Sequence, residues 1–552
     1  MRLRLIKPPA LAVAGAAALV AGSMSPWATF AGFPGKMTLA GFPGGARLFA
    51  LLLAAGALLF ALEVGGRRRA ALFAAAGAGA VVAVNIVAIT DHGGGLGSVA
   101  WGAWMAVAGA GALIAAAWRL PADPERRSER GGGEPAPEEW RRLHPALEVA
   151  AIAVALSSVL GAVVWGLEIA ESSRFISFLV FLVFASVALH YLGVFSALAV
   201  LFARHHRMAM LLGAAAAVAF PFTQQGNAYW IRVFASIGVF AVAAIGLNVV
   251  VGLAGLLDLG YVAFFGVGAY VGALFSNAAL TTTNIHLPFM VVVILGGCIA
   301  AVFGLVIGTP TLRLRGDYLA IVTLGFGEIF RITANNWDGL TRGPNGISGV
   351  PDLALGGFDF GESHQLFGIT LPGFANYYFV ELVLIAGAIL VFTRLNDSRI
   401  GRAWVAIRED ELAAAASGID TIRLKLLAFA IGAFLAGAAG TVNAHVTTQV
   451  SPDSYTFLES ILLVAAVVLG GMGTVPGALL GSTALFVIPE KLRAFQDKRL
   501  LLFGAALILV MRFRPEGLVP SRRRRRELRS EAPEGVPGLA GASGPPPGGP
   551  LS

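Results

Sequence analysis

Long apolar runs separated by short polar stretches recur along almost the whole of this 552-residue chain. In the first part of the chain, such runs lie at about 9–23, 46–64, 70–90, 99–118, 146–169 and 175–203. A helix needs about 20 apolar residues to cross the hydrocarbon core of a bilayer, so each run predicts a membrane-spanning helix. The pattern therefore predicts an all-α polytopic membrane protein.

Lysine and arginine gather in alternate loops between these runs. The loops at 67–69 and 204–207 are basic, whereas 91–98 is rich in glycine and carries neither residue. Because loops rich in lysine and arginine stay in the cytoplasm, we expect six early spans that return the chain to the cytoplasm at Arg207. The first run resembles a signal peptide, but we interpret it as an uncleaved span because further spans follow at once.

From Met208 onward the apolar segments change in character. Some are ordinary spans and others are shortened or interrupted by glycine; they lie at about 208–222, 229–250, 252–275, 288–312, 318–331, 378–394, 424–446, 457–490 and 499–512. A cytoplasmic position for the arginines at 522–526 requires that 457–490 be two segments, broken at the glycine cluster of 470–473. With that break, we expect about sixteen membrane segments, six early and ten late.

Polar stretches divide the chain further. Residues 119–145 are rich in proline, glycine, acids and arginines, and predict a solvated linker within the first part. Residues 332–377 contain glycine and proline throughout, and the count of spans places them outside the cell. We therefore expect N-terminal membrane segments at 1–207, a membrane core at 208–515 and a basic, disordered cytoplasmic tail at 516–552.

Composition supports a membrane protein and excludes several other classes. Apolar residues make up 57% of the chain and charged residues 13%, about half the usual share of charge in a soluble domain. The net charge of +8 reflects arginine at the cytoplasmic ends of spans and does not indicate nucleic acid. Cys298 is the only cysteine, so no internal disulfide or cysteine metal cluster can form. Neighbouring His205 and His206 point about 100° apart on a helix, so we expect no metal site.

One charged stretch, 396–429, lies between two apolar segments of the late part and still has helical character. Acids at 409–411 precede small residues at 413–418, the last of which is glycine. Acids favour the first turn of a helix, alanine its interior and glycine its end. We predict a helix of about two to three turns, with Asp420 or Thr421 capping the helix that follows. Such a helix suits a groove on another protein; the alternative is an ordinary alanine-rich loop.

Two acids lie inside glycine-rich apolar segments: Asp258 lies in the segment at 252–275, and Glu328 lies in the segment at 318–331. A buried acid is costly unless it faces water or a partner, so Asp258 either lines a pathway or lies near a membrane surface. Gly266 and Gly268 do not form a dinucleotide loop, because no strand precedes them. The candidate pathway residues are Asp258, Gly266, Gly268, Gly272, Gly325, Gly327 and Glu328.

Five blocks of the late part, taken together, are characteristic. They begin with GLNVVVGLAG and lie at 246–270, 312–331, 335–347, 401–420 and 467–481. As an ordered set across about 210–515, they resemble the LivM-type permease subunit of branched-chain amino acid ABC importers. The first 200 or so residues lie outside this resemblance.

The resemblance implies that 396–429 holds the cytoplasmic coupling helix, which docks on an ATP-hydrolysing subunit. The usual importer pattern is Glu-Ala-Ala, three residues and then Gly, and Ala413, Ala414 and Gly418 match its small positions. Leu412 holds the place of the glutamate, and Glu411 precedes it. The coupling residues implied in this way are Glu409, Asp410, Glu411, Ala413, Ala414 and Gly418.

The resemblance also implies a location and partners. The chain would form the translocation path for branched-chain amino acids in the bacterial inner membrane. Its partners would be a second homologous permease subunit, two ABC ATPase subunits and an extracytoplasmic substrate-binding protein that docks on 332–377. Because the sequence lacks the G-x-x-x-x-G-K-[ST] phosphate loop, we expect no enzymatic activity and no cofactor in this chain, with ATP bound by the partners.

Other interpretations stay open at this point. Urea and amide importers share this fold, although GDYLAIVTLGFGEI at 316–329 is more similar to the amino acid branch. An ion-coupled secondary transporter would need paired intramembrane acids, and the two acids above do not make such a pair. A membrane-embedded enzyme would need convergent groups, whereas His190, His286 and His445 are scattered. The sequence indicates no role for the first six segments.

Overall fold

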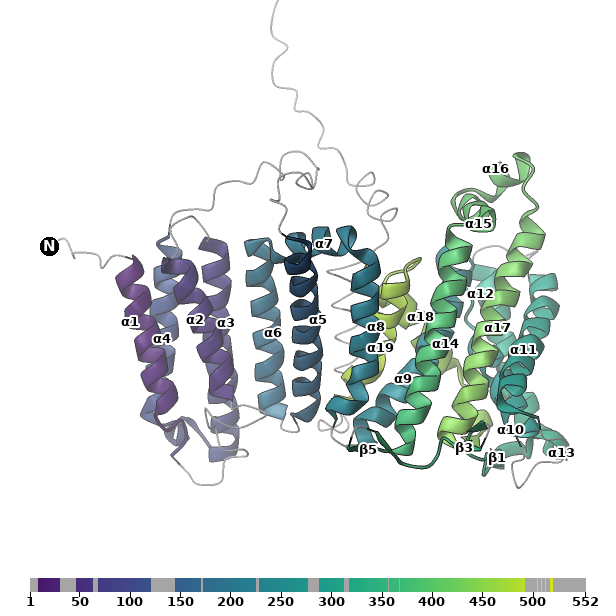
Figure 1. The fold of residues 1–552 in the computed structure, drawn as a ribbon, viewed down its shortest axis with the longest axis horizontal. Helices are drawn as coiled ribbons and strands as arrows, with labels where there is room; N and C mark the ends of the chain where they lie inside the picture. The colour runs from purple at the N-terminus through teal and green to yellow at the C-terminus, as the bar shows by residue number, and fades with distance from the viewer. Residues whose placement is uncertain are drawn as a thin grey trace, which may run out of the picture. The chain divides into compact units, whose positions relative to one another are not determined.

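The computed structural model describes residues 8–29, 46–62, 68–120, 144–169, 172–224, 228–276, 287–311, 317–355, 357–366, 368–491, and 504, 508, 512 and 517–519. The chain divides into two compact units, residues 1–223 and 224–552. Both are built almost entirely from helices (Figure 1). Among the described helices, ten are long and apolar enough to cross a membrane, and four shorter ones are also apolar. The chain is therefore a predominantly helical, multi-pass membrane protein, as the apolar pattern predicts.

Small residues let the helices of the first unit approach closely. Its described helices are α1 (Pro8–Met24), α2 (Ala46–Leu62), α3 (Arg68–Gly93), η1 (Leu96–Ser98), α4 (Trp101–Trp118), α5 (Pro145–Glu168), α6 (Ser172–Leu192), α7 (Val194–Arg204) and α8 (His206–Thr223). Helices α1 and α4 pack closely, because a Cβ added at Gly15 would lie only 2.9 Å from the carbonyl oxygen of Gly109. Glycine and alanine interfaces of this kind are typical of helices that pack in membranes.

The last early span is shorter than predicted. The predicted run at 175–203 is wrong as a single helix, because α6 ends at Leu192 and α7 begins at Val194. Between them Gly193 has φ 79°, a left-handed conformation that glycine adopts without steric cost. The chain turns there, and α7 lies across the end of α5 (Figure 1).

The contacts end the first unit at Thr223, because α8 packs against α5 and α7. The boundary predicted from the sequence lies before this helix, at 207/208, and it stays a prediction. Most of the predicted linker at 119–145 and of the predicted tail at 516–552 falls outside the described residues.

In the second unit, α17 has the largest number of helical neighbours. The helices are α9 (Ala228–Leu247), η4 (Asn248–Leu253), α10 (Val262–Phe275), α11 (Phe289–Thr311), α12 (Asp317–Asn336), α13 (Asp338–Thr341), α14 (Gly373–Asn396), α15 (Arg399–Glu409), α16 (Glu411–Ala416), α17 (Thr421–Thr447), α18 (Phe457–Gly470) and α19 (Val475–Lys491). α17 packs against α9, α10 and α11. A Cβ added at Gly268 would lie 1.9 Å from the carbonyl oxygen of Gly437, so α10 meets α17 where only glycine fits.

Two helical segments of this unit are interrupted. α9 continues as the π-helix η4, and residues 254–261 then run without a regular helix to α10. The predicted break within 457–490 is confirmed, because α18 ends at Gly470 and α19 begins at Val475, with Gly471 and Gly473 at φ 124° and 78° between them. The total of sixteen segments stays a prediction, since most of 499–512 falls outside the described residues.

Short strands and the pair α15–α16 occupy opposite ends of the second unit (Figure 1). The antiparallel pairs are β1 (Ile347–Ser348) with β6 (Gln449–Val450), β2 (Ala354–Leu355) with β3 (Phe358–Asp359), and β4 (His364–Leu366) with β5 (Ile369–Leu371), and the turns η5 (Gly343–Asn345) and η6 (Pro452–Ser454) lie beside them in sequence. α12 continues to Asn336, so the predicted segment at 332–377 begins later than expected. Its placement opposite 396–423 agrees with the prediction, and which end is cytoplasmic stays a prediction.

Candidate functional sites

Two side chains from distant parts of the chain, and one of its own, hold the irregular segment 254–261 and the first residue of α10. The backbone N–H of Leu259 donates to Thr323 Oγ1 at 3.0 Å, and that of Val262 donates to Ser460 Oγ at 3.1 Å. Asp258 Oδ1 accepts from the N–H of Gly260 at 2.9 Å. Non-helical backbone is tolerated at membrane depth only where its polar groups find partners in protein or water. These contacts therefore make the break in the helix stable.

Asp258 is enclosed by the unit, with 1% of its surface exposed. It lies in the interior of the second unit, and its contact with Gly260 shows a role in holding the turn. A role in a transport pathway stays a prediction for this residue.

A cavity of about 160 Å³ lies beside this irregular segment. Three segments contribute its walls: the start of α10, the middle of α12 and the start of α18. The lining residues are Leu259, Val262, Leu324, Gly327, Glu328, Tyr455, Phe457 and Ser460. Most of this lining is apolar, so the cavity suits a hydrocarbon group with one charged neighbour.

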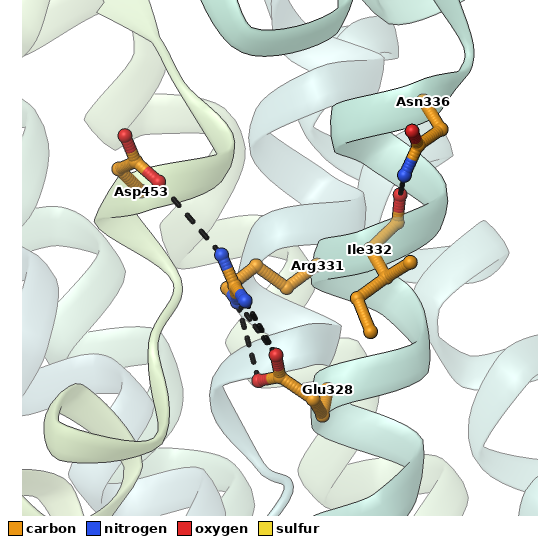
Figure 2. A network of polar contacts seen from close by, with 5 residues as sticks. All are labelled: Glu328, Arg331, Ile332, Asn336 and Asp453. Atoms are coloured by element: carbon orange, nitrogen blue, oxygen red, sulfur yellow. Dashed lines mark hydrogen bonds and ion pairs between the residues drawn. The ribbon is translucent and has the colours of Figure 1, made fainter.

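Glu328, at the edge of the cavity, forms an ion pair with Arg331 one helical turn further along α12 (Figure 2). Arg331 Nε donates to Glu328 Oε1 and Oε2 at 3.0 and 3.2 Å. A terminal nitrogen of Arg331 also points toward Asp453, at 3.9 Å from Oδ1. The side chains of Glu328 and Arg331 are 44% and 29% exposed, so the pair stays accessible from outside the unit.

The predicted pathway glycines fall into two groups. Gly327 lines the cavity and packs against Gly260, with 3.2 Å between an added Cβ and the Cα of Gly260. Gly266 does not line the cavity, but it makes room for the rings of Phe330 and of the lining residue Tyr455. The remaining three do not line it: Gly268 and Gly272 face α17, and a Cβ added at Gly325 would meet no described atom within 4 Å.

Three residues that line this cavity, and the ion-pair partner of Glu328, were not predicted from the sequence. Arg331 could have been found, because residues three apart share one face of a helix, and Glu328 was already a candidate. Tyr455, Phe457 and Ser460 come from a segment more than 120 residues further along the chain, so no local pattern links them to Glu328.

The helix α16 has the start and stop signals that the sequence predicts, but it is shorter. Asp410 Oδ1 accepts from the N–H groups of Leu412 and Ala413 at 2.9 and 3.0 Å. Gly418 ends the turn with φ 83°, and Asp420 caps α17 by accepting from the N–H of Arg423 at 3.1 Å. The predicted two to three turns are wrong, because α16 has six residues and Glu409 belongs to the preceding helix.

That preceding helix, α15, was not predicted. Its buried Trp404 donates from Nε1 to the carbonyl oxygen of Leu424 in α17 at 2.7 Å. Its Arg408 donates to the carbonyl oxygen of Gly252 at 2.8 Å, at the end of η4 and directly before the irregular segment. α15 therefore connects α16 to both α17 and the broken helix beside the cavity.

The predicted coupling residues divide between the interior and the surface. Ala414 is 4% exposed and packs into the core of the unit, so it does not belong to an outward small face. Glu411 pairs with Lys425 Nζ at 2.6 Å. Leu412, Ala413 and Gly418 are exposed and could meet a partner, as are Glu409 and Asp410. Docking of an ATPase on this surface stays a prediction.

Histidines lie apart from this cavity in the described residues. His445 contacts Ser276 Oγ through Nε2 at 3.0 Å and the carbonyl oxygen of Pro351 through Nδ1 at 2.9 Å, and His205 pairs with Glu148 in the first unit at 2.8 Å. Across the described ranges no group of three histidine, cysteine, aspartate or glutamate side chains could hold a metal ion. His286 falls outside these ranges.

The sequence of the second unit matches a known family of membrane permeases. The family described as "Branched-chain amino acid transport system / permease component" matches residues 229–511, about half of the chain, beginning at α9. The chain belongs to this family. The match lies wholly within the second unit, which also contains the cavity and α15–α16.

Individual relatives agree with this assignment. The LivM permease proteins of the high-affinity branched-chain amino acid transport systems of Salmonella typhimurium and Escherichia coli are each 41% identical to this chain over 333 residues, 58% of this chain and 76% of the relative. The LivH permease protein of Salmonella typhimurium is 29% identical over 286 residues, 51% of this chain and 91% of the relative. No solved structure matches the chain.

Proposed function

We propose that this chain is the membrane-spanning permease subunit of an ABC importer for branched-chain amino acids in the bacterial inner membrane. The observation that carries the mechanism is the bond from Arg408 to Gly252, which joins the exposed helix α16, through α15, to the broken helix beside the cavity. Family membership supports the class of substrate, because the LivM and LivH relatives are permease proteins for branched-chain amino acids.

The proposed partners are a second homologous permease subunit, two ABC ATPase subunits and an extracytoplasmic substrate-binding protein. The chain carries no phosphate-binding loop in its sequence, so ATP would be bound and hydrolysed by the ATPase subunits. The exposed surface of α16, formed by Leu412, Ala413 and Gly418, would face one ATPase. The strands at the opposite end of the unit would face the binding protein.

In the proposed cycle, ATP binding closes the two ATPases and displaces α16. Trp404 and Arg408 tie α15 to α17 and to η4, so a displacement of α16 moves these elements with it. The backbone can bend at Gly255, whose φ of 71° lies at the start of the irregular segment. Rearrangement around a broken helix is a known route to alternating access, so the pathway would open to each side of the membrane in turn.

Uptake by a reconstituted importer tests this function. The chain would be co-expressed with the permease, ATPase and binding-protein genes adjacent to its own, and the purified complex placed in liposomes containing ATP. We expect uptake of labelled leucine that requires the ATPase subunits and the binding protein, and no ATP hydrolysis by this chain alone. Leucine uptake by the chain alone, driven by a proton or sodium gradient, would instead identify a secondary transporter. Competition by urea or amides, and by no amino acid, would show that the importer carries urea or amides.

A further inference from the structure

The cavity has the size and chemistry of a compartment for an aliphatic side chain. Its volume of about 160 Å³ is similar to that of an engineered protein cavity of about 150 Å³, which is lined by leucine, isoleucine and phenylalanine and binds benzene. The branched side chains of leucine, isoleucine and valine are smaller than benzene or close to it in size. Leu259, Val262, Leu324 and Phe457 present apolar atoms to this space. Moving an aliphatic group from water into it is therefore favourable.

A negative charge lines the same cavity, and a positive charge is paired with it. Glu328 lines it, and Arg331 meets Glu328 through two nitrogens (Figure 2). An α-amino acid carries an ammonium and a carboxylate on adjacent atoms, next to its side chain. A carboxylate such as that of Glu328 binds an ammonium group, and a guanidinium binds a carboxylate through parallel hydrogen bonds. The pair therefore complements the zwitterionic head of an amino acid.

The balance of energies favours an exchange of partners. Because Glu328 and Arg331 are partly exposed, an entering ligand can reach both charges. A zwitterion placed between them brings one positive and one negative charge, so no charge is left without a partner. Asp453 lies outside this exchange, because it is 81% exposed and 3.9 Å from Arg331, a separation at which an exposed pair contributes little.

We propose that this cavity is a substrate subsite, in which the aliphatic side chain lies among α10, α12 and α18 while Glu328 binds the ammonium group and Arg331 binds the carboxylate. The inference rests on the proposed function and adds the place where the substrate is held within this chain. Urea and simple amides have neither an aliphatic side chain nor opposite charges, so they would not use this subsite.

Protection of a cysteine in the cavity tests the position of the side chain. Cys298 would first be replaced by Ala, and Leu324→Cys and Gly325→Cys would be made in that background. Leu324 lines the cavity, whereas its neighbour Gly325 is exposed and does not, so the second variant is a matched control on the same helix. The full importer in liposomes would be labelled with a small maleimide during turnover, with empty or leucine-loaded binding protein.

We expect leucine to slow labelling at position 324 by threefold or more and to leave labelling at position 325 unchanged. Equal labelling of Leu324→Cys with and without leucine, in an importer that takes up leucine, would overturn the subsite. Absence of leucine uptake in the unmutated importer would instead refute the proposed function, so the two failures are distinguishable.

Exchange of the two charges tests the binding of the head group. Glu328→Gln and Arg331→Gln should each reduce leucine uptake at low substrate by about tenfold or more, because a charge-assisted hydrogen bond is lost. Asp453→Asn, at the exposed rim, should change it by less than about threefold. The double variant Glu328→Arg with Arg331→Glu keeps an ion pair but reverses its order along the helix. Restored uptake in the double variant would show that the pair only stabilises α12, and would overturn the proposal.

Discussion

The two units bury the same kinds of polar side chain for different purposes. In the first unit, buried Asn85 donates to the carbonyl oxygen of Val81 in its own helix and to Ser177 Oγ on α6, so it adds a contact between regular helices. In the second, buried Asn248 donates to the carbonyl oxygen of Thr474 and accepts from the N–H of Gly473, so it supports the break between α18 and α19. The first contact joins two side chains of regular helices, whereas the second satisfies backbone groups that the break leaves without a helical partner.

This difference coincides with the family match. The matched residues all lie in the second unit, where irregular segments follow η4 and α18, and the cavity lies beside the first of these segments. The unit without a match joins its helices by glycine contacts and by ion pairs such as that of Glu148 on α5 with Arg204 on α7.

Two buried tryptophans provide the largest expected effect. Trp27 and Trp404 are fully buried, and each donates from its indole nitrogen to a backbone carbonyl, at 2.9 and 2.7 Å. Replacing either by Ala should lower the free energy of unfolding by about 3–5 kcal/mol, through lost burial and the cavity left behind. Only Trp404→Ala should also abolish ATPase association, because it releases α15. Thermal unfolding in detergent and ATPase pull-down would measure both effects.

The variant Trp27→Ala is the control for loss of stability, because Trp27 is buried to the same extent but lies in the first unit. If both variants lose the ATPase equally, loss of pull-down reflects general instability and the anchoring role of α15 is wrong. Phenylalanine at position 404 keeps most of the buried surface, and should keep most of the association.

The two asparagines are expected to differ by a smaller amount. Asn248→Leu would leave the N–H of Gly473 without its partner, which costs about 1–3 kcal/mol of unfolding free energy. Asn85→Leu should cost less than about 1 kcal/mol, because one of its polar atoms, Oδ1, already lacks a hydrogen bond in the described structure. Unfolding midpoints of the two variants would show the difference. Equal losses of stability would contradict the idea that the break between α18 and α19 depends on a polar side chain more than regular helices do.

Exposed small residues should show the smallest effect on stability. Ala413 on α16 and Gly161 on α5 are both exposed, so replacing either by Trp should change the unfolding free energy by less than about 0.5 kcal/mol. Ala413→Trp should nevertheless weaken ATPase association tenfold or more, if α16 docks in a close groove. Glu409→Gln, which alters only an exposed charge, should do much less.

A titration of the ATPase against each variant would detect these changes. Unchanged ATPase binding by Ala413→Trp would show that α16 is only a linker and does not dock on the ATPase. Reduced binding by Gly161→Trp would point to an effect of surface tryptophan in general.

Local signals explain what the sequence could predict. The signals at Asp410, Gly418 and Asp420 each act within four residues along the chain. The ends of α16 and the start of α17 can therefore be predicted from the sequence alone. The break at 470–473 is also local, because Gly471 and Gly473 adopt conformations that other residues avoid.

Other features depend on contacts that no local pattern encodes. α15 carries many charges along a short length, so its buried Trp404 and Ile407 were not recognised as one face of a helix. Thr323 and Ser460 meet the irregular segment from distances of 64 and 198 residues along the chain. A cavity wall assembled from such separate segments is a property of the packing, and single residues within it carry no signature of their own.

The helix α17 can act as a lever. Asp420 fixes one end of it beside α16, and at the other end β6 pairs with β1, where Val450 lies opposite Ile347. With 27 residues it is roughly 40 Å long at 1.5 Å per residue. A tilt of about 10° around its midpoint would move each end by roughly 3.5 Å in opposite directions, without breaking any hydrogen bond within the helix. Mechanical work done at the α16 end would thus reach the strands at the far end as displacement, with the direction reversed.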